Sequence, residues 1–147
     1  MARYVTTVRT RRSVADAFAY MADVRNFAEW DPGVGKVVQV DGDGASLGAV
    51  FDVTLSGMRA TTFRYRTVEY AQPSRLLVVA DTSLLRSTDR ITVRADGDAT
   101  VATYDADLSL KSPMRLAAPL LAVAFRHIGD RAAAGLRRVL DGELQPC

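Results

Sequence analysis

The stretch from Val34 to Leu110 alternates strand-like segments with short turns, and this pattern restricts the fold more than any other feature of the 147-residue chain. The segments are rich in β-branched and aromatic residues and end at turn-forming pairs such as Asp41-Gly42 and Asp96-Gly97. Because the connections are hairpin-sized, we expect an antiparallel meander. Its six predicted strands are Val37–Val40, Ala49–Ser56, Thr61–Tyr70, Leu76–Ala80, Leu84–Ala95 and Thr100–Leu110.

Alternation with a period of two assigns the strand residues to two faces of the sheet. Polar residues such as Asp52, Arg64 and Arg90 belong to one face, which we expect to be solvated. The opposite face is apolar and must be covered. We place on it Phe51, Val53, Leu55, Phe63, Tyr65, Ile91, Val93, Ala102, Tyr104, Ala106 and Leu108.

The C-terminal segment is the one long enough to cover that face. Ser112-Pro113 is typical of a helix start, and apolar residues then recur at spacings of three and four down to about Leu140. At 1.5 Å per residue the helix is about 40 Å long. Pro119 predicts a kink or a restart near Leu116 to Ala118, because proline lacks an N–H donor. The apolar positions are Met114, Ala117, Leu121, Phe125, Ile128, Ala132, Leu136 and Val139.

The N-terminal region adds one strand and two short helices. Val5–Thr10 is the strand, Ser13 caps a helix that runs to about Met21, and Asp23 caps a shorter helix. That second helix holds Phe27 and Trp30 and stops at Pro32-Gly33. The predicted class is therefore α+β, with a seven-stranded antiparallel sheet around a long C-terminal helix, and the length favours one domain over residues 1–147.

Composition argues against several function classes. With one histidine and one cysteine, His127 and the terminal Cys147, the chain cannot build a His/Cys zinc site, a disulfide or a buried Cys-His dyad. The net charge is +2 and the basic residues are scattered among acids, so we expect no nucleic-acid partner. No apolar run approaches the length of a membrane span or a signal core, so we predict a cytoplasmic protein with a free thiol, no metal and no cofactor.

Five segments, read in order, carry a family resemblance. Residues 23–33 are similar to a pattern of Asp, three residues, an aromatic, two residues, Trp, one residue and Pro; the others are 47–51, 65–73, 100–104 and 118–121. Together they resemble the START-like, helix-grip SRPBCC superfamily, which includes polyketide cyclases and aromatases, pollen-allergen-like proteins, lipid-transfer START domains and coenzyme Q-binding-like bacterial proteins. The resemblance implies a curved sheet that grips the long helix, with an apolar cavity between them for a hydrophobic small molecule.

If the cavity exists, in-facing residues line it, and the phenols of Tyr65 and Tyr104 can hydrogen-bond a ligand carbonyl or hydroxyl. For each residue the alternative is plain packing in the core; for Trp30 the two interpretations are evenly balanced. The predicted ligand-binding residues are Phe27, Trp30, Phe51, Val53, Phe63, Tyr65, Tyr104, Leu108, Leu121 and Phe125.

Glu69, Tyr65, Tyr104 and His127 are the candidates for acid-base catalysis. Glu69 ends a strand in the in-facing register, where it either acts as a base or forms an ion pair with a neighbouring arginine such as Arg75. His127 lies beside the main apolar stripe of the helix, which favours a surface position over a catalytic one.

Asp89 is a further in-facing polar residue, because it lies two residues before Ile91. An unpaired charge inside the protein is costly. We therefore expect Asp89 either at the open end of the sheet or paired with an arginine.

Three functions follow as hypotheses. The leading one is binding or transport of an apolar ligand such as a lipid, polyketide or isoprenoid. The second is a polyketide cyclase or aromatase-like enzyme that acts in the same cavity. The third is a protein-interaction module, in which exposed aliphatic parts of the helices contact a second subunit, so that the chain is a monomer or a homodimer.

Overall fold

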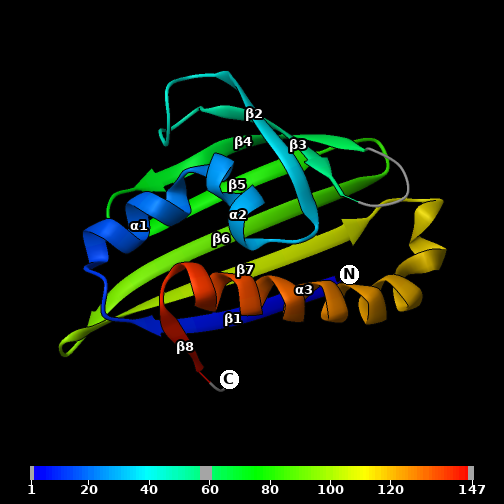
Figure 1. The fold of residues 1–147 in the computed structure, drawn as a ribbon. Helices are drawn as coiled ribbons and strands as arrows, with labels where there is room; N and C mark the ends of the chain where they lie inside the picture. The colour runs from blue at the N-terminus through cyan, green and yellow to red at the C-terminus, as the bar shows by residue number, and fades with distance from the viewer. Residues whose placement is uncertain (1, 57–60, 146–147) are drawn as a thin grey trace.

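The computed structural model describes residues 2–56 and 61–145. Its main element is a curved antiparallel sheet with the strand order β2-β3-β4-β5-β6-β7-β1-β8, and Figure 1 shows the helices on one side of it. The α+β helix-grip fold is thereby confirmed. The strands are β1 (Ala2–Thr10), β2 (Val34–Asp41), β3 (Val50–Leu55), β4 (Thr62–Ala71), β5 (Arg75–Asp81), β6 (Leu85–Asp96), β7 (Ala99–Leu110) and β8 (Gly142–Gln145).

The described sheet has one strand more than the seven we predict. β8 follows the long helix and pairs with β1, with Thr7 opposite Gln145 and Thr10 opposite Gly142. Its four residues lack the alternation of a half-buried strand, because β8 sits at the sheet edge and is largely exposed or half-buried. Backbone pairing with β1, and not an apolar face, places this strand.

The two short helical segments between β1 and β2 begin where their capping residues predict. α1 (Val14–Ala22) starts after Ser13, whose side chain accepts a hydrogen bond from the Asp16 N–H at 3.0 Å. Asp23 caps the 3₁₀ turn η1 (Val24–Asn26) through the Arg25 N–H, and α2 (Phe27–Trp30) follows directly. These caps satisfy N–H groups that have no partner within the helix.

The C-terminal helical region restarts at Ala118, within the stretch that the sequence predicts. The 3₁₀ turn η2 (Met114–Ala117) ends there, and α3 (Ala118–Val139) carries Pro119 in its first turn, where a missing N–H costs nothing. The predicted apolar stripe extends too far, however. Ala117 is exposed, as are the neighbouring Leu120 and Val123, at 80% and 75%; the side chain of Met114 and the whole of Cys147 lie outside the described residues.

Two glycines let the C-terminal half of α3 sit closely on its neighbours. A Cβ atom at Gly129 would overlap the ring of Tyr4 in β1, and one at Gly135 would overlap the carbonyl oxygen of Trp30 in α2. Ala132 and Leu136, on the same half of the helix, are buried. The C-terminal half of α3 is therefore clamped against β1 and α2.

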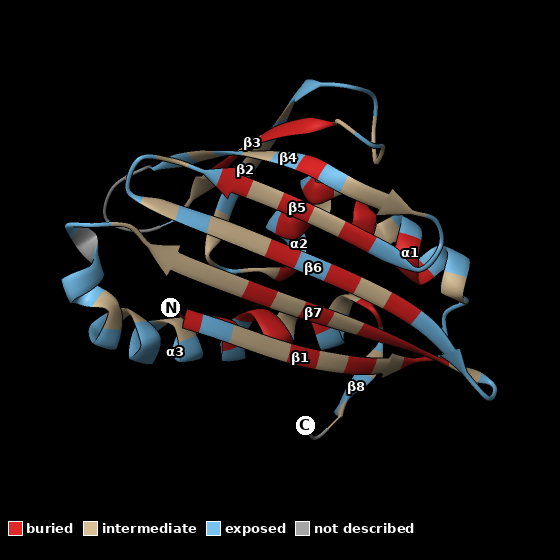
Figure 2. Cartoon of the chain, turned by 180° about the vertical axis from the view of Figure 1, so that it is seen from behind, coloured by how far each residue is buried: buried red, intermediate tan, exposed pale blue. Residues whose placement is uncertain are grey.

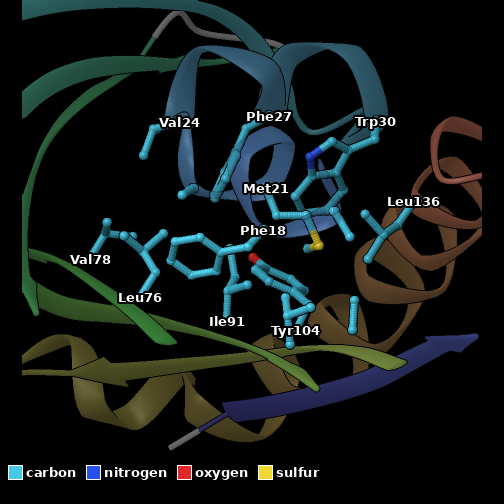
Figure 3. Packing of buried hydrophobic residues seen from close by; sticks show 14 of the residues in the cluster. Phe18, Met21, Val24, Phe27, Trp30, Leu76, Val78, Ile91, Tyr104 and Leu136 are labelled. Atoms are coloured by element: carbon cyan, nitrogen blue, oxygen red, sulfur yellow. The ribbon is translucent and has the colours of Figure 1, made fainter. Parts of the chain in front are cut away.

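The strands separate an apolar inner face from a wet outer face, as their alternation predicts. Figure 2 shows buried and more exposed residues alternating along β6 and β7. The buried cluster on the inner face includes Phe18 and Met21 of α1 together with Leu76, Ile91 and Leu136, several of which are labelled in Figure 3. No helix within the described ranges is both long and apolar enough to cross a membrane.

Candidate ligand-binding cavity

A cavity of about 550 Å³ lies on the inner side of the sheet, against α3. Its wall comes from η1, α2 and the loop that follows, from β3, β4, β6 and β7, and from α3. Small side chains leave the space open: Ala106 of β7 and Ser87 of β6 both face it. On the helix side, Leu121, Phe125 and Ile128 reach the wall from the N-terminal half of α3, which is not clamped by Gly129 and Gly135.

Most of the side chains predicted to bind ligand are part of this wall, and two are not. Trp30 and Phe51 lie outside it, with 1% and 0% of their surfaces exposed, in the packed core. The predicted residues that the wall contains are Phe27, Val53, Phe63, Tyr65, Tyr104, Leu108, Leu121 and Phe125.

Trp30 supports the wall from behind. Its ring lies edge-to-face on Tyr104, with the centroids 5.1 Å apart, and is tilted against Phe27 at 5.0 Å (Figure 3). Edge-to-face pairs of this kind are favoured by the quadrupoles of the two rings. Among the described residues, the buried indole N–H of Trp30 has no hydrogen-bond partner. Trp30 thus fixes the positions of two rings that do line the cavity.

Among the carboxyl groups of the wall, Asp89 has the pKa that is shifted furthest from its ordinary value. It lies in the middle of β6 with 7% of its surface exposed, and the Tyr104 hydroxyl donates a hydrogen bond to its Oδ2 at 3.2 Å. Burial raises the pKa of Asp89 to about 7; the hydrogen bond from Tyr104 opposes this effect, and the charges of Asp31 and Asp105 add to it. The expected positions, at the open end of the sheet or beside an arginine, are wrong, because Asp89 is buried within the ladders of β6, opposite Val78 and Ala106, and its hydrogen-bond partner is a phenol.

Asp31 is a wall residue that sequence reasoning did not single out. It directly follows α2, and its Oδ1 accepts a hydrogen bond from the Gly33 N–H at 2.8 Å. Burial nevertheless raises the pKa of Asp31, more than the hydrogen bond from Gly33 lowers it. The sequence feature that could have identified Asp31 as a wall residue is its position immediately after Trp30 in the segment 23–33.

Tyr65 and Ser87 form a second polar pair in the wall. The Tyr65 hydroxyl reaches across β5 and donates to Ser87 Oγ at 2.8 Å. The residue of β5 opposite Ser87 is Ala80, whose small side chain leaves room for this reach. Burial raises the pKa of both Tyr65 and Tyr104, and the negative charge of Asp89 raises each further.

Glu69 lies outside the cavity, and its predicted in-facing register is wrong. The pairing of β4 with β5 is irregular between Thr67 and Glu69, so that buried Thr67 faces in while Glu69 pairs opposite Leu77 on the outer face. There Glu69 forms an ion pair with Arg75, which was the alternative interpretation.

His127 is exposed on α3 and is absent from the wall, which agrees with the surface position that its spacing favours. The basic side chain that does reach the wall is Arg131, one turn further along the helix and itself exposed. Within residues 2–56 and 61–145, no three side chains of His, Cys, Asp or Glu come together as a metal site requires.

Comparisons with known proteins agree with this geometry. A family model described as polyketide cyclase / dehydrase and lipid transport matches residues 1–141. No curated protein matches the sequence.

Several solved structures share the fold at low sequence identity. A START superfamily protein from Mycobacterium smegmatis superposes with a TM-score of 0.75 at 14% identity, over 96% of this chain and 98% of that one. Major latex-like protein 151 from Panax ginseng gives 0.58 at 12% identity, over 88% and 97%. The di-domain ARO/CYC protein BexL from the BE-7585A biosynthetic pathway gives 0.62 at 17% identity, over 91% of this chain and 49% of that one. At such identities the likeness establishes the fold alone.

Proposed function

Because this chain belongs to the polyketide cyclase / dehydrase and lipid transport family, we propose that it binds and carries an apolar small molecule in the cavity between its sheet and α3. The observation that carries the proposal is the cavity itself, about 550 Å³ in volume with a largely aliphatic and aromatic wall. Small-molecule sites are typically concave, mostly apolar and roughly 300–1,000 Å³ in volume. Lipids, polyketides and isoprenoids are the candidate ligand classes.

Affinity would come mainly from removing apolar ligand surface from water, at about 25 cal/mol for each Å² buried before ordering costs. Leu121, Phe125 and Ile128 of α3 supply such surface on one side, and Val53 and Phe63 of the sheet supply it on the other. The exposed N-terminal part of α3 is the natural place for entry, because it is the less tightly packed half of the helix.

Native mass spectrometry tests this function. The protein is measured as purified and again after incubation with phenylnaphthylamine, a neutral apolar dye. We expect a co-purified small molecule or a one-to-one dye complex, either of which denaturation releases. A spectrum that contains only the bare chain in both samples contradicts the proposal.

A second candidate function is catalysis of the cyclase or aromatase type. The observation that favours it is the Asp89–Tyr104 hydrogen bond in the cavity wall, because a carboxyl group with a pKa of about 7 is suited to proton transfer near neutral pH. In this scheme the Asp89 carboxylate removes a proton from the carbon between two ketone groups, and the Tyr65 hydroxyl donates a hydrogen bond to the enolate oxygen that forms.

Turnover of a linear polyketide thioester tests this second candidate. Asp89→Asn is expected to lower kcat strongly, and the wild-type rate is expected to rise as the pH passes through about 7 and Asp89 loses its proton. Glu69→Gln is the control, since Glu69 is outside the cavity. Near-wild-type turnover in Asp89→Asn, Tyr65→Phe and Tyr104→Phe would exclude these residues from the chemistry.

The interaction-module hypothesis and the cytoplasmic location stay predictions. Leu116, Leu120 and Val123 form an exposed aliphatic ridge along η2 and α3, which gives the third hypothesis a defined surface. Light scattering over a range of protein concentrations measures whether the chain is a monomer or a homodimer.

A further inference from the structure

Five of the polar side chains in the cavity wall interact with one another through hydrogen bonds or charge, whereas Ser56 and Arg131 are not part of this group. We call the group the acidic end of the cavity and define it by Asp31, Asp89, Tyr65, Tyr104 and Ser87. Hydrogen bonds join Tyr104 to Asp89 and Tyr65 to Ser87. The charges of Asp31 and Asp89 each act on both phenols, so the four ionisable groups lie close enough to influence one another.

The acidic end has no cation of its own among the described residues. The charged groups that act on Asp89 are Asp31, which follows α2, and Asp105, on the neighbouring strand β7, and both are negative. Arg131 reaches the wall from α3, but its side chain is exposed and it is not among the groups that shift the pKa of Asp89, Asp31 or the phenols. An anion at this end would therefore meet carboxylates without a compensating positive charge.

The Asp89 carboxyl group is also short of hydrogen bonds. It is almost fully buried, and the hydrogen bond that it accepts comes from Tyr104, on one of its two oxygens. A carboxylate can accept about four hydrogen bonds. A ligand group that donates a hydrogen bond would improve the solvation of Asp89, whereas a ligand carboxylate would add a second buried charge of the same sign.

We infer that the cavity selects amphiphiles whose polar end is a hydrogen-bond donor without negative charge, an ammonium or hydroxyl group, over the matching carboxylates. This inference rests on the proposed function, because it requires the ligand to occupy the cavity. The apolar body of the ligand lies against the aliphatic part of the wall, which includes Leu55, Leu108, Leu121 and Phe125. The polar end lies at Asp89 and Asp31. Free fatty acids are accordingly poor ligands.

A displacement experiment with three compounds of equal chain length tests the inference. Phenylnaphthylamine is bound first, and decylamine, decanol and decanoate then compete for it at about pH 8, where Asp89 is ionised. We expect decylamine and decanol to displace the dye at concentrations at least about tenfold lower than decanoate, as one unpaired buried charge predicts. The advantage of decylamine should shrink at about pH 6, because Asp89 then carries a proton.

Asp89→Asn removes the charge and keeps the shape, so it should reduce the difference between decylamine and decanoate. Asp107→Asn is the matched control. It makes the same charge change on the outer face of β7, where Asp107 lies near Asp105 and away from the cavity. If Asp89→Asn does not fold, the order in which decylamine, decanol and decanoate displace the dye from the wild-type protein still tests the inference.

The outcomes distinguish this inference from the proposed function. Dye binding together with weaker displacement by decanoate supports both. Dye binding with decanoate equal to or better than decylamine overturns the inference and leaves the binding function in place; a head group held by Arg131 would give that result. Failure of the wild-type protein to bind the dye, in a sample that carries no co-purified molecule, overturns both.

Discussion

Burial of Asp89 in the cavity wall has a cost that depends on pH. Its pKa is about 7 in the folded protein, whereas an aspartate in an unfolded chain has a pKa of about 3.9. Between these values the folded state holds a proton that the unfolded state has released. The contribution of Asp89 to stability therefore falls as the pH rises from about 4 to about 7 and stays constant above that.

Replacing Asp89 with asparagine should remove this dependence. At about pH 8 we expect Asp89→Asn to be more stable than the wild type by up to about 4 kcal/mol, because the variant buries no charge. The difference should decline steadily towards about pH 4. Urea unfolding at a series of pH values measures it, with Asp107→Asn as the control. A difference that is the same at every pH would mean that Asp89 is not the titrating group.

At the scale of elements, α3 consists of two functionally different halves. Its C-terminal half is clamped: Leu136 is fully buried, and Gly129 and Gly135 allow close approach to β1 and α2. Its N-terminal half contributes Leu121 and Phe125 to the cavity wall and leaves Leu120 exposed. The fold thus anchors one end of the helix and leaves space for a ligand under the other.

Truncating one leucine in each half tests this division. Leu136→Ala should lower the free energy of unfolding by about 3 kcal/mol, because it leaves a void in the packed core. Leu120→Ala, the matched change at an exposed site of the same helix, should alter it by less than about 0.5 kcal/mol. Chemical denaturation gives both values. Similar losses in the two variants would show that the halves are packed alike.

Because of the close contact at Gly135, we expect a glycine-to-alanine change in this helix to lower stability instead of raising it. Alanine is the better helix former by about 1 kcal/mol, so Gly135→Ala in an isolated helix would be stabilising. Here the added Cβ overlaps the Trp30 carbonyl, and we expect a loss of about 2 kcal/mol instead. The melting temperature reports the sign directly. Ala134→Gly, at the exposed neighbouring position, should show the ordinary propensity cost alone; a stabilised Gly135→Ala variant would contradict the contact.

Sequence patterns predict the elements well and their contacts less well. The period of two assigns Phe51 and Phe63 to the same face, yet Phe51 is packed in the core and Phe63 lines the cavity, because that period identifies the face of the sheet and not what packs against each residue. The irregular pairing before Glu69 reverses the facing of that residue without a local signal. Periodicity likewise locates α3, but it does not show that only the C-terminal half of this helix packs closely against β1 and α2.

For the protein as a whole, the proposed ligand binding requires that one cavity is the binding site. A curved sheet, a helix anchored at one end and small side chains at Ala106 and Ser87 together leave about 550 Å³ open. Trp30 and its ring contacts hold that wall in place from the core. The wall is acidic at one end and largely apolar elsewhere, and this asymmetry is the basis of the proposed selectivity.

The most direct measurement is the dissociation constant of phenylnaphthylamine for the wild type and two phenylalanine variants, obtained by fluorescence titration. Ala106→Phe places a ring inside the cavity, whereas Thr88→Phe places the same ring on the outer face of the sheet. Circular dichroism checks that both are folded. We predict that Ala106→Phe weakens binding at least about tenfold, the equivalent of about 1.4 kcal/mol, while Thr88→Phe binds like the wild type. Unchanged binding in a folded Ala106→Phe variant would contradict the account, because the dye would then bind elsewhere.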